Sequence, residues 1–234
     1  MFSTRGLNVY FFLILGVGSQ ANGSPFVPYW DKVGAVGYYD NGVLSMARTL
    51  GGPTNQVTTP GRKVLVGWLM GGSQSQSLPR DISLSSSFEL LQAFIPELQT
   101  LRSKPLAYSS KPSAGSLQME IVANFARQQG TFGLVLLSDS HGEGGVNLTI
   151  ECDGNACTAH ADASAQKLPA YTAPLRTAGT YSIHAYVDTN IVELIINNRT
   201  AFAMYANPPP ENAFFSVLGN GDVKAWELAS ANFA

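Results

Sequence analysis

Cysteine is one of the few residue types in this chain whose number and spacing point to a definite chemistry. Cys152 and Cys157 are its two cysteines, and they enclose the sequence Asp-Gly-Asn-Ala. A Gly-Asn pair between two β-prone runs is typical of a hairpin turn, which would bring the two thiols together. We expect a disulfide across this hairpin in an oxidising compartment, with two buried free thiols as the alternative. A metal site needs more ligands than two cysteines and three scattered histidines supply.

The remaining candidate catalytic residues do not form a recognisable set. The sequence has no Gly-x-Ser-x-Gly elbow, no phosphate-binding loop and no histidines at metal-ligand spacing. His141, His160 and His184 stand alone, and we interpret each as a surface residue or a strand residue with local partners. We therefore expect no cofactor and no metal.

The first 33 residues contain a short apolar run at positions 9–17. It follows Arg5 and precedes Ser19-Gln20-Ala21, a pattern that fits a secretory signal cleaved after Ala21. The run is too short for a membrane-spanning helix. Its aromatic and β-branched residues also fit a buried strand in a chain whose true start is missing. Both interpretations of segment 1–33 remain open.

Three Asn-x-Ser/Thr triplets could accept N-linked glycans, at Asn22, Asn147 and Asn198. Each triplet is weak evidence alone. Together with the cysteine pair they favour a secreted or vacuolar glycoprotein.

The overall composition excludes some classes of partner. Charged residues make up 13% of the 234 residues, the net charge is −2, and no run of Lys or Arg occurs. Nothing in this balance would attract a phosphate backbone or an anionic membrane surface. We expect neither nucleic-acid nor membrane binding. The low charge and the 45% hydrophobic content suit a turn-rich β protein with a sizeable core.

The pattern of short strands and polar turns predicts an all-β fold. Residues 36–50 read as strand, turn and strand, and 63–69 read as a strand buried on both faces. From residue 117 onward, strand-like runs recur at regular spacing with polar turns between them. This part of the chain predicts an antiparallel sandwich of two sheets. The predicted runs are 117–127, 131–139, 145–152, 156–163, 180–188, 190–198, 200–206, 213–219 and 223–229.

Several motifs occur in a fixed order between residues 34 and 102. Asp-Asn-Gly at 40–42 precedes Met-Ala at 46–47, and Arg-Lys-Val-Leu-Val-Gly-Trp occupies 62–68. Leu-Pro-Arg-Asp-Ile-Ser-Leu follows at 78–84, and Pro-Glu-Leu-Gln-Thr-Leu-Arg at 96–102. The run at 183–193 contains Val-Asp-Thr-Asn-Ile-Val-Glu. In this order and spacing the motifs resemble glycoside hydrolase family 32, the invertases and fructan hydrolases, over residues 34–229.

The resemblance implies a domain organisation. Residues 34–75 would form the partial last blade of a five-bladed β-propeller, 76–104 a connecting arm, and 105–234 the C-terminal antiparallel β-sandwich. Segment 1–33 would then contribute a strand of a truncated blade. An isolated partial blade leaves strand edges that a closed propeller would pair.

The resemblance also implies a substrate and a site. Family members hydrolyse sucrose or fructans, and Asp40 would line the mouth of the sugar pocket; the alternative is that Asp40 only begins an Asn-Gly turn. Val43 replaces a basic residue found in several plant members. Arg80 would fix the domain junction through a buried carboxylate. Asp188 and Glu193 would be structural.

The catalytic carboxylates of the family have no counterpart in this sequence. A retaining glycosidase needs a nucleophile and an acid/base carboxyl about 5 Å apart. In the family these lie in Asn-Asp-Pro-Asn and Glu-Cys-Pro motifs, with a stabilising Asp in Arg-Asp-Pro. Asp81 and Glu151 only imitate two of these motifs, since Ile82 follows Arg80-Asp81 and Asp153 follows Glu151-Cys152 where the motifs have proline. We expect the chain to be inactive alone, as the C-terminal part of such an enzyme. The alternative is a secreted, non-catalytic carbohydrate-binding or structural glycoprotein.

Overall fold

The computed structural model describes the chain as two compact units, Met1–Pro96 and Glu97–Ala234. The residues that the structure describes are 17–19, 27–29, 35–36, 44–50, 64–69, 75–85, 90–209 and 211–229. Within them, no helix is long and apolar enough to cross a membrane.

The first unit is built around an antiparallel sheet in the order β3-β4-β5-β7-β8. Its strands follow one another along the chain, as in a meander, and β6 adds to β5 at one end. A separate pair, β1-β2, accompanies this sheet. The strands are β1 (Val17–Ser19), β2 (Val27–Tyr29), β3 (Ala35–Val36), β4 (Leu44–Leu50), β5 (Val64–Leu69), β6 (Ser75–Gln76), β7 (Arg80–Leu84) and β8 (Leu90–Phe94).

The segment 76–104 is not the single connecting arm that the sequence suggested. Its first half forms β7 and β8, which extend the sheet of the first unit through pairing of β7 with β5. Its second half forms the 3₁₀ helix η1 (Pro96–Leu101) and β9 (Arg102–Leu106), which belong to the second unit. The alternation of buried Ile82 and exposed Ser83 shows the two-residue period of a strand. The arm was an implication of the family resemblance, and the strand period within it was not used.

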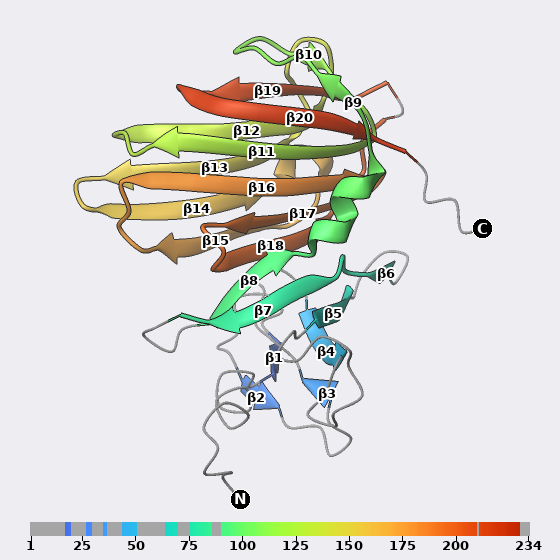
Figure 1. Ribbon diagram of the computed structural model, residues 1–234. Coiled ribbons are helices and arrows are strands. Elements are labelled where there is room, and N and C mark those ends of the chain that lie inside the picture. The colour runs from blue at the N-terminus through green and yellow to red at the C-terminus, as the bar shows by residue number, and fades with distance from the viewer. Residues whose placement is uncertain are drawn as a thin grey trace, which may run out of the picture. The chain divides into compact units, whose positions relative to one another are not determined.

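The second unit is an antiparallel β-sandwich, which confirms the predicted fold class for this part of the chain. One sheet has the order β18-β17-β16-β11-β20-β9 and the other β10-β19-β12-β13-β14-β15. Figure 1 shows the sheets as two layers, with β11, β16 and β20 in one and β12, β13 and β14 in the other. The strands after β9 are β10 (Ser113–Ala114), β11 (Gln118–Ala126), β12 (Gly130–Ser138), β13 (Val146–Asp153), β14 (Ala156–Asp162), β15 (Ala170–Leu175), β16 (Thr180–Asp188), β17 (Ile191–Ile196), β18 (Thr200–Tyr205), β19 (Phe214–Leu218) and β20 (Gly221–Leu228). A short 3₁₀ turn, η2 (Ser164–Gln166), joins β14 to β15.

All nine strands predicted after residue 117 are present, and three strands were missed. The missed strands β9, β10 and β15 are edge strands of their sheets. An edge strand buries less apolar surface and tolerates proline, so its sequence pattern is weaker. Pro105 in β9 and Pro174 in β15 illustrate this.

The core lies between the two sheets and comes from alternate residues of each strand. Phe125 of β11, Phe132 and Leu134 of β12, and Phe215 of β19 have no exposed surface. Successive side chains of a strand point to opposite faces, so each strand contributes one apolar row. Strand β13 follows this rule, with buried and half-exposed residues alternating from Val146. The apolar faces exclude water from the space between the sheets and stabilise the unit.

A glycine in the middle of β12 allows two backbones to approach closely. Gly133 has φ of +147°, and a Cβ built there would lie 2.2 Å from the carbonyl oxygen of Leu148. Leu148 belongs to the neighbouring strand β13. Any side chain would therefore push two paired strands apart.

We expect Gly133→Ala to lower the free energy of unfolding by roughly 3 kcal/mol, because it combines a steric overlap with an unfavourable φ. Gly179→Ala is the matched control, since a Cβ there meets no atom within 4 Å. The control should change stability by about 0.5 kcal/mol or less. Urea denaturation followed by circular dichroism measures both. Equal effects of the two substitutions would contradict the close approach at Gly133.

Candidate functional site: a buried carboxylate on the sandwich

The residue expected to touch sugar lies outside the described part of the chain. Asp40 and its Asn-Gly turn fall between β3 and β4, in a stretch that the structure does not describe. Asn22 and Val43 also lie outside the residues that the structure describes. The role of Asp40 therefore stays a prediction.

The two cysteines lie opposite each other in the β13–β14 hairpin. Cys152 of β13 pairs with Cys157 of β14, and their Cα atoms are 4.1 Å apart. The structure has a disulfide between them. Both side chains are nearly fully buried and pack in the core of the sandwich. The disulfide closes the hairpin whose turn contains Gly154, with φ of +53°.

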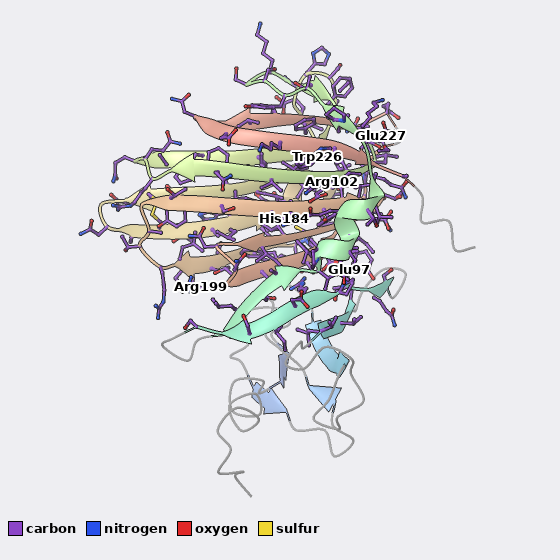
Figure 2. All side chains as sticks on the ribbon, viewed as in Figure 1. Glu97, Arg102, His184, Arg199, Trp226 and Glu227 are labelled. Carbon is purple, nitrogen blue, oxygen red and sulfur yellow. A yellow bond between two sulfur atoms is a disulfide. The ribbon has the colours of Figure 1, made fainter. Side chains whose placement is uncertain are left out.

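Four strands place a group of polar and aromatic side chains together on the outer face of the first sandwich sheet. Glu120, near the start of β11, lies opposite Tyr186 of β16 and Trp226 of β20. His184 precedes Tyr186 by two residues on the same face of β16, and Arg102 begins β9 at the sheet edge. Figure 2 labels Arg102, His184 and Trp226 on this sheet. We call these five residues the Glu120 cluster.

The carboxylate of Glu120 is the centre of this cluster. Its side chain has no exposed surface. Arg102 donates from Nε to Oε2 and from Nη2 to Oε1, both at 2.7 Å, so the pairing is bidentate. His184 donates from Nε2 to Oε1 at 2.8 Å. The Arg102 guanidinium also lies 3.8 Å from the centre of the Trp226 ring, in cation–π geometry. A buried carboxylate is thus matched by charged and polar donors.

These contacts determine the protonation state of the cluster. Burial alone would raise the pKa of Glu120, but the hydrogen bonds from Arg102 and His184 outweigh it and lower the pKa from 4.5 to about 2. The hydrogen bond to Glu120 raises the pKa of Arg102. Burial, together with the negative charge of Glu120, raises the pKa of Tyr186. At neutral pH the site is therefore an ion pair beside a neutral phenol.

This arrangement favours a structural role over acid–base catalysis. A general acid must hold a proton near neutral pH, and Glu120 stays ionised far below it. The ion pair instead joins the beginning of β9 to the first part of β11, with β9 itself paired to β20. In the sequence, Arg102 is only the end of a motif, and His184 stands alone. A lone glutamate within the apolar run of β11 was the available signal for this site.

Arg80 lies in β7, and its side chain is fully buried. Its Nη1 donates to Oε1 of Gln92 on β8 at 3.0 Å, and its guanidinium lies 5.7 Å from the centre of the Phe94 ring. The pairing of Arg80 with a buried carboxylate at the domain junction stays a prediction.

Two further acidic side chains of the sandwich make polar contacts away from the Glu120 cluster. Glu151 is exposed on β13, and its carboxylate lies 3.6 Å from Nε2 of His160. Asp188 accepts a hydrogen bond from Gln118 at 3.1 Å, in agreement with a structural role. Among the described residues, no group of three His, Cys, Asp or Glu side chains could hold a metal ion.

One open depression, with a volume of about 490 Å³, lies at the end of the sandwich. The β11–β12 turn and the loop before β16 line it with Arg127, Gln128, Gln129, Thr177, Ala178 and Gly179. Arg127 and Gln129 both donate to the carbonyl oxygen of Gly154. None of the lining residues is a carboxylate, so the depression lacks the groups that glycoside hydrolysis requires.

The comparison with protein families identifies the sandwich. The family model described as "Glycosyl hydrolases family 32 C terminal" matches residues 92–231, which cover η1 and the whole sandwich. The chain belongs to glycoside hydrolase family 32. The family motif that ends on Arg102 therefore has a physical role in this member, because Arg102 pairs with the buried Glu120.

Solved structures of family 32 enzymes share the fold. They include sucrose-6-phosphate hydrolase from Lactobacillus gasseri, with a TM-score of 0.70 and 14% identity over 92% of this chain and 47% of that one. Fructan 1-exohydrolase IIa from Cichorium intybus has a TM-score of 0.69 and 15% identity over 87% of this chain and 52% of its own. Exo-inulinase from Aspergillus awamori has a TM-score of 0.65 and 15% identity over 92% and 49%.

The chain thus spans about half the length of these enzymes. At these identities the likeness shows the fold alone. Comparison with curated proteins finds no match.

Removal of Arg102 should destabilise the sandwich strongly, because it leaves the Glu120 carboxylate buried without its main partner. We expect Arg102→Ala to lower the free energy of unfolding by roughly 3–5 kcal/mol. Lys104→Ala is the matched control on the same strand, since Lys104 pairs with Glu227 at 2.9 Å on the exposed surface. The control should cost about 1 kcal/mol or less. Urea denaturation of both variants tests this difference, and similar costs would argue against the role of the Glu120 cluster.

The lowered pKa of Glu120 predicts a loss of stability in acid. A carboxyl group whose pKa is lower in the folded state stabilises the fold above its unfolded pKa and loses that contribution as the pH falls through the folded value. For Glu120 the window runs from about 4.5 down to about 2. Denaturation of the wild type and Glu120→Gln at several pH values measures it. The wild type should be more stable at pH 7, and the difference should shrink below pH 4.5. A constant difference would contradict the assignment.

Proposed function

We propose that this chain is the C-terminal part of a family 32 enzyme that hydrolyses the O-glycosyl bonds of sucrose or fructans, as a β-fructofuranosidase does. The match of the family model over residues 92–231 carries the proposal. The names of the similar structures support it, since they include a sucrose-6-phosphate hydrolase, a fructan exohydrolase and an exo-inulinase. This chain covers about half of each of these enzymes, which agrees with its being one part of a longer enzyme. The partner of the intact enzyme would be a sucrose- or fructan-type carbohydrate.

The contribution of the first unit is also a proposal. Its antiparallel strands β3, β4, β5, β7 and β8 follow one another in sequence order, which is how the strands of a propeller blade are connected. We assign this sheet to the last blade of the parent propeller. Asp40 would then contact sugar at the rim of the pocket that the complete propeller encloses.

Hydrolysis would require carboxylates that this sequence does not contain. The Asn-Asp-Pro-Asn, Arg-Asp-Pro and Glu-Cys-Pro motifs are absent. Glu120, a buried carboxylate of the sandwich, is ionised and already bound by Arg102 and His184. The purified chain should therefore have no glycosidase activity, whereas the intact parent should have it.

Assays of the purified chain on sucrose and inulin test its inactivity. A complete family 32 enzyme serves as the positive control for the assay. We expect no release of fructose by this chain, and turnover would show that other residues supply the catalytic carboxylates.

The reading frame upstream of Met1 tests whether the chain belongs to a longer parent enzyme. A continuous frame without the three motifs would refute the proposed enzyme.

Carbohydrate titration separates this proposal from a free-standing binding module. A fragment that lacks the rest of its pocket should not bind sucrose or inulin measurably, because one rim residue provides too few contacts. Saturable binding by the isolated chain, monitored by calorimetry, would favour the alternative of a non-catalytic carbohydrate-binding protein.

A further inference from the structure

The two glycosylation triplets of the sandwich lie in very different settings. Asn198 lies in the β17–β18 turn, and Asn147 lies within β13. The sequence alone treats them as equal, because each is an Asn followed two residues later by Thr. The structure separates them by exposure and by what each side chain already does.

The β17–β18 turn is formed by two consecutive asparagines. Asn197 and Asn198 have φ of 49° and 55°, and the N–H of Arg199 donates to the carbonyl oxygen of Ile196 at 3.0 Å. Two successive residues with positive φ within such a bond are typical of a tight hairpin turn. Asparagine tolerates this backbone conformation better than most residues.

Asn197 holds this turn in place. Its Oδ1 accepts from the N–H of Ser182 at 2.7 Å, and its Nδ2 donates to the carbonyl oxygen of Thr180 at 3.2 Å. Both partners lie at the beginning of β16, the strand next to β17. The side chain of Asn197 therefore anchors the turn to the sheet, and its amide is not available for modification.

Asn198 has neither of these constraints. It is exposed, and within the described part of the chain its amide makes no hydrogen bond. Figure 2 labels its neighbour Arg199 in the same turn, at the end of the hairpin. We propose that Asn198 carries an N-linked glycan and that Asn147 does not.

Asn147 is enclosed by its own sheet. Strand β13 is paired on both sides, so that Asn147 lies between Val135 of β12 and Asp162 of β14. Its side chain is half-buried, and Val135 is only 8% exposed. Thr149, the third residue of the triplet, lies between Gly133 and His160 and is also half-buried. Side chains of both neighbouring strands therefore restrict the room for a sugar at Asn147, whereas Asn198 has no such flanking strands.

The modification requires the secretory pathway, so this inference rests on the predicted secreted or vacuolar location. The Cys152–Cys157 disulfide fits the same oxidising compartment. In the transfer, Nδ2 of Asn198 forms a bond to the anomeric carbon of an oligosaccharide carried on a polyprenyl diphosphate. The bond from that carbon to the diphosphate oxygen breaks, the lipid diphosphate leaves with the electron pair, and the amide loses one proton.

Site-specific mass spectrometry of the secreted full chain tests the proposal. The chain is directed into the secretory pathway of a yeast host, and peptides containing Asn147 and Asn198 are compared before and after enzymatic removal of N-glycans. Most molecules should carry a glycan at Asn198, and few at Asn147. Because each asparagine is measured on its own peptide, occupancy of Asn22 does not affect the result.

Substitutions at Thr200 provide the matched controls. Thr200→Ala removes the triplet and should abolish the glycan, whereas Thr200→Ser keeps the triplet and should retain it. Asn198→Asp should also abolish it, since Asp suits the same turn conformation. An unmodified Asn198 in secreted protein, a glycan that survives Thr200→Ala, or equal occupancy of Asn147 would each overturn the proposal. Sucrose and inulin hydrolysis play no part in this readout, so its failure leaves the proposed enzymatic function untouched.

Discussion

Burial of two apolar sheet faces against each other is the constraint on which the sandwich depends. Each strand can contribute only every second side chain to the space between the sheets, because successive side chains point to opposite faces. Phe125, Phe132 and Phe215 fill this space from three different strands and have no exposed surface. A slip of one residue in any pairing would turn an apolar row outward, so the hydrophobic pattern and the strand register determine each other. The cross-strand disulfide and the glycine at position 133 are possible only in this register.

The same two-residue period brings charges together on the opposite face of the sheet. Glu120 alternates with Met119 and Ile121, which point into the core, and so it must lie on the outer face. There it is buried by its partners, and the ion pair with Arg102 offsets the cost of removing its charge from water. Such a pair adds little net stability compared with apolar residues of similar size, but the loss of one partner leaves a buried charge. We therefore regard the Glu120 cluster as a device that specifies where β9 joins the sheet.

The family assignment and the enzymatic proposal rest on different levels of evidence. The sandwich identifies the family because its fold and its sequence pattern both match family 32. Activity depends on a site, and a fold alone does not supply one. In this chain the Glu120 carboxylate is bound in an ion pair with Arg102, and the open depression at the end of the sandwich has no carboxylate among its lining residues. The family assignment of the sandwich therefore does not by itself assign an activity to this chain.

By itself, the sequence determined the all-β class and nine strands of the sandwich, because alternating apolar residues and turn residues act locally and are visible along the chain. The family entered separately, through the resemblance of its ordered motifs to family 32. It did not reveal the edge strands β9, β10 and β15, since edges bury little and accept proline. It also placed β7 and β8 in an arm, although pairing with β5 makes them part of a sheet. Only the tertiary structure joined Arg102, Glu120, His184 and Trp226, which come from four strands far apart in sequence. Likewise, only the structure distinguished Asn198 from its neighbour Asn197, because the difference is a pair of hydrogen bonds to another strand. Long-range pairing decides such contacts, and no local pattern encodes them.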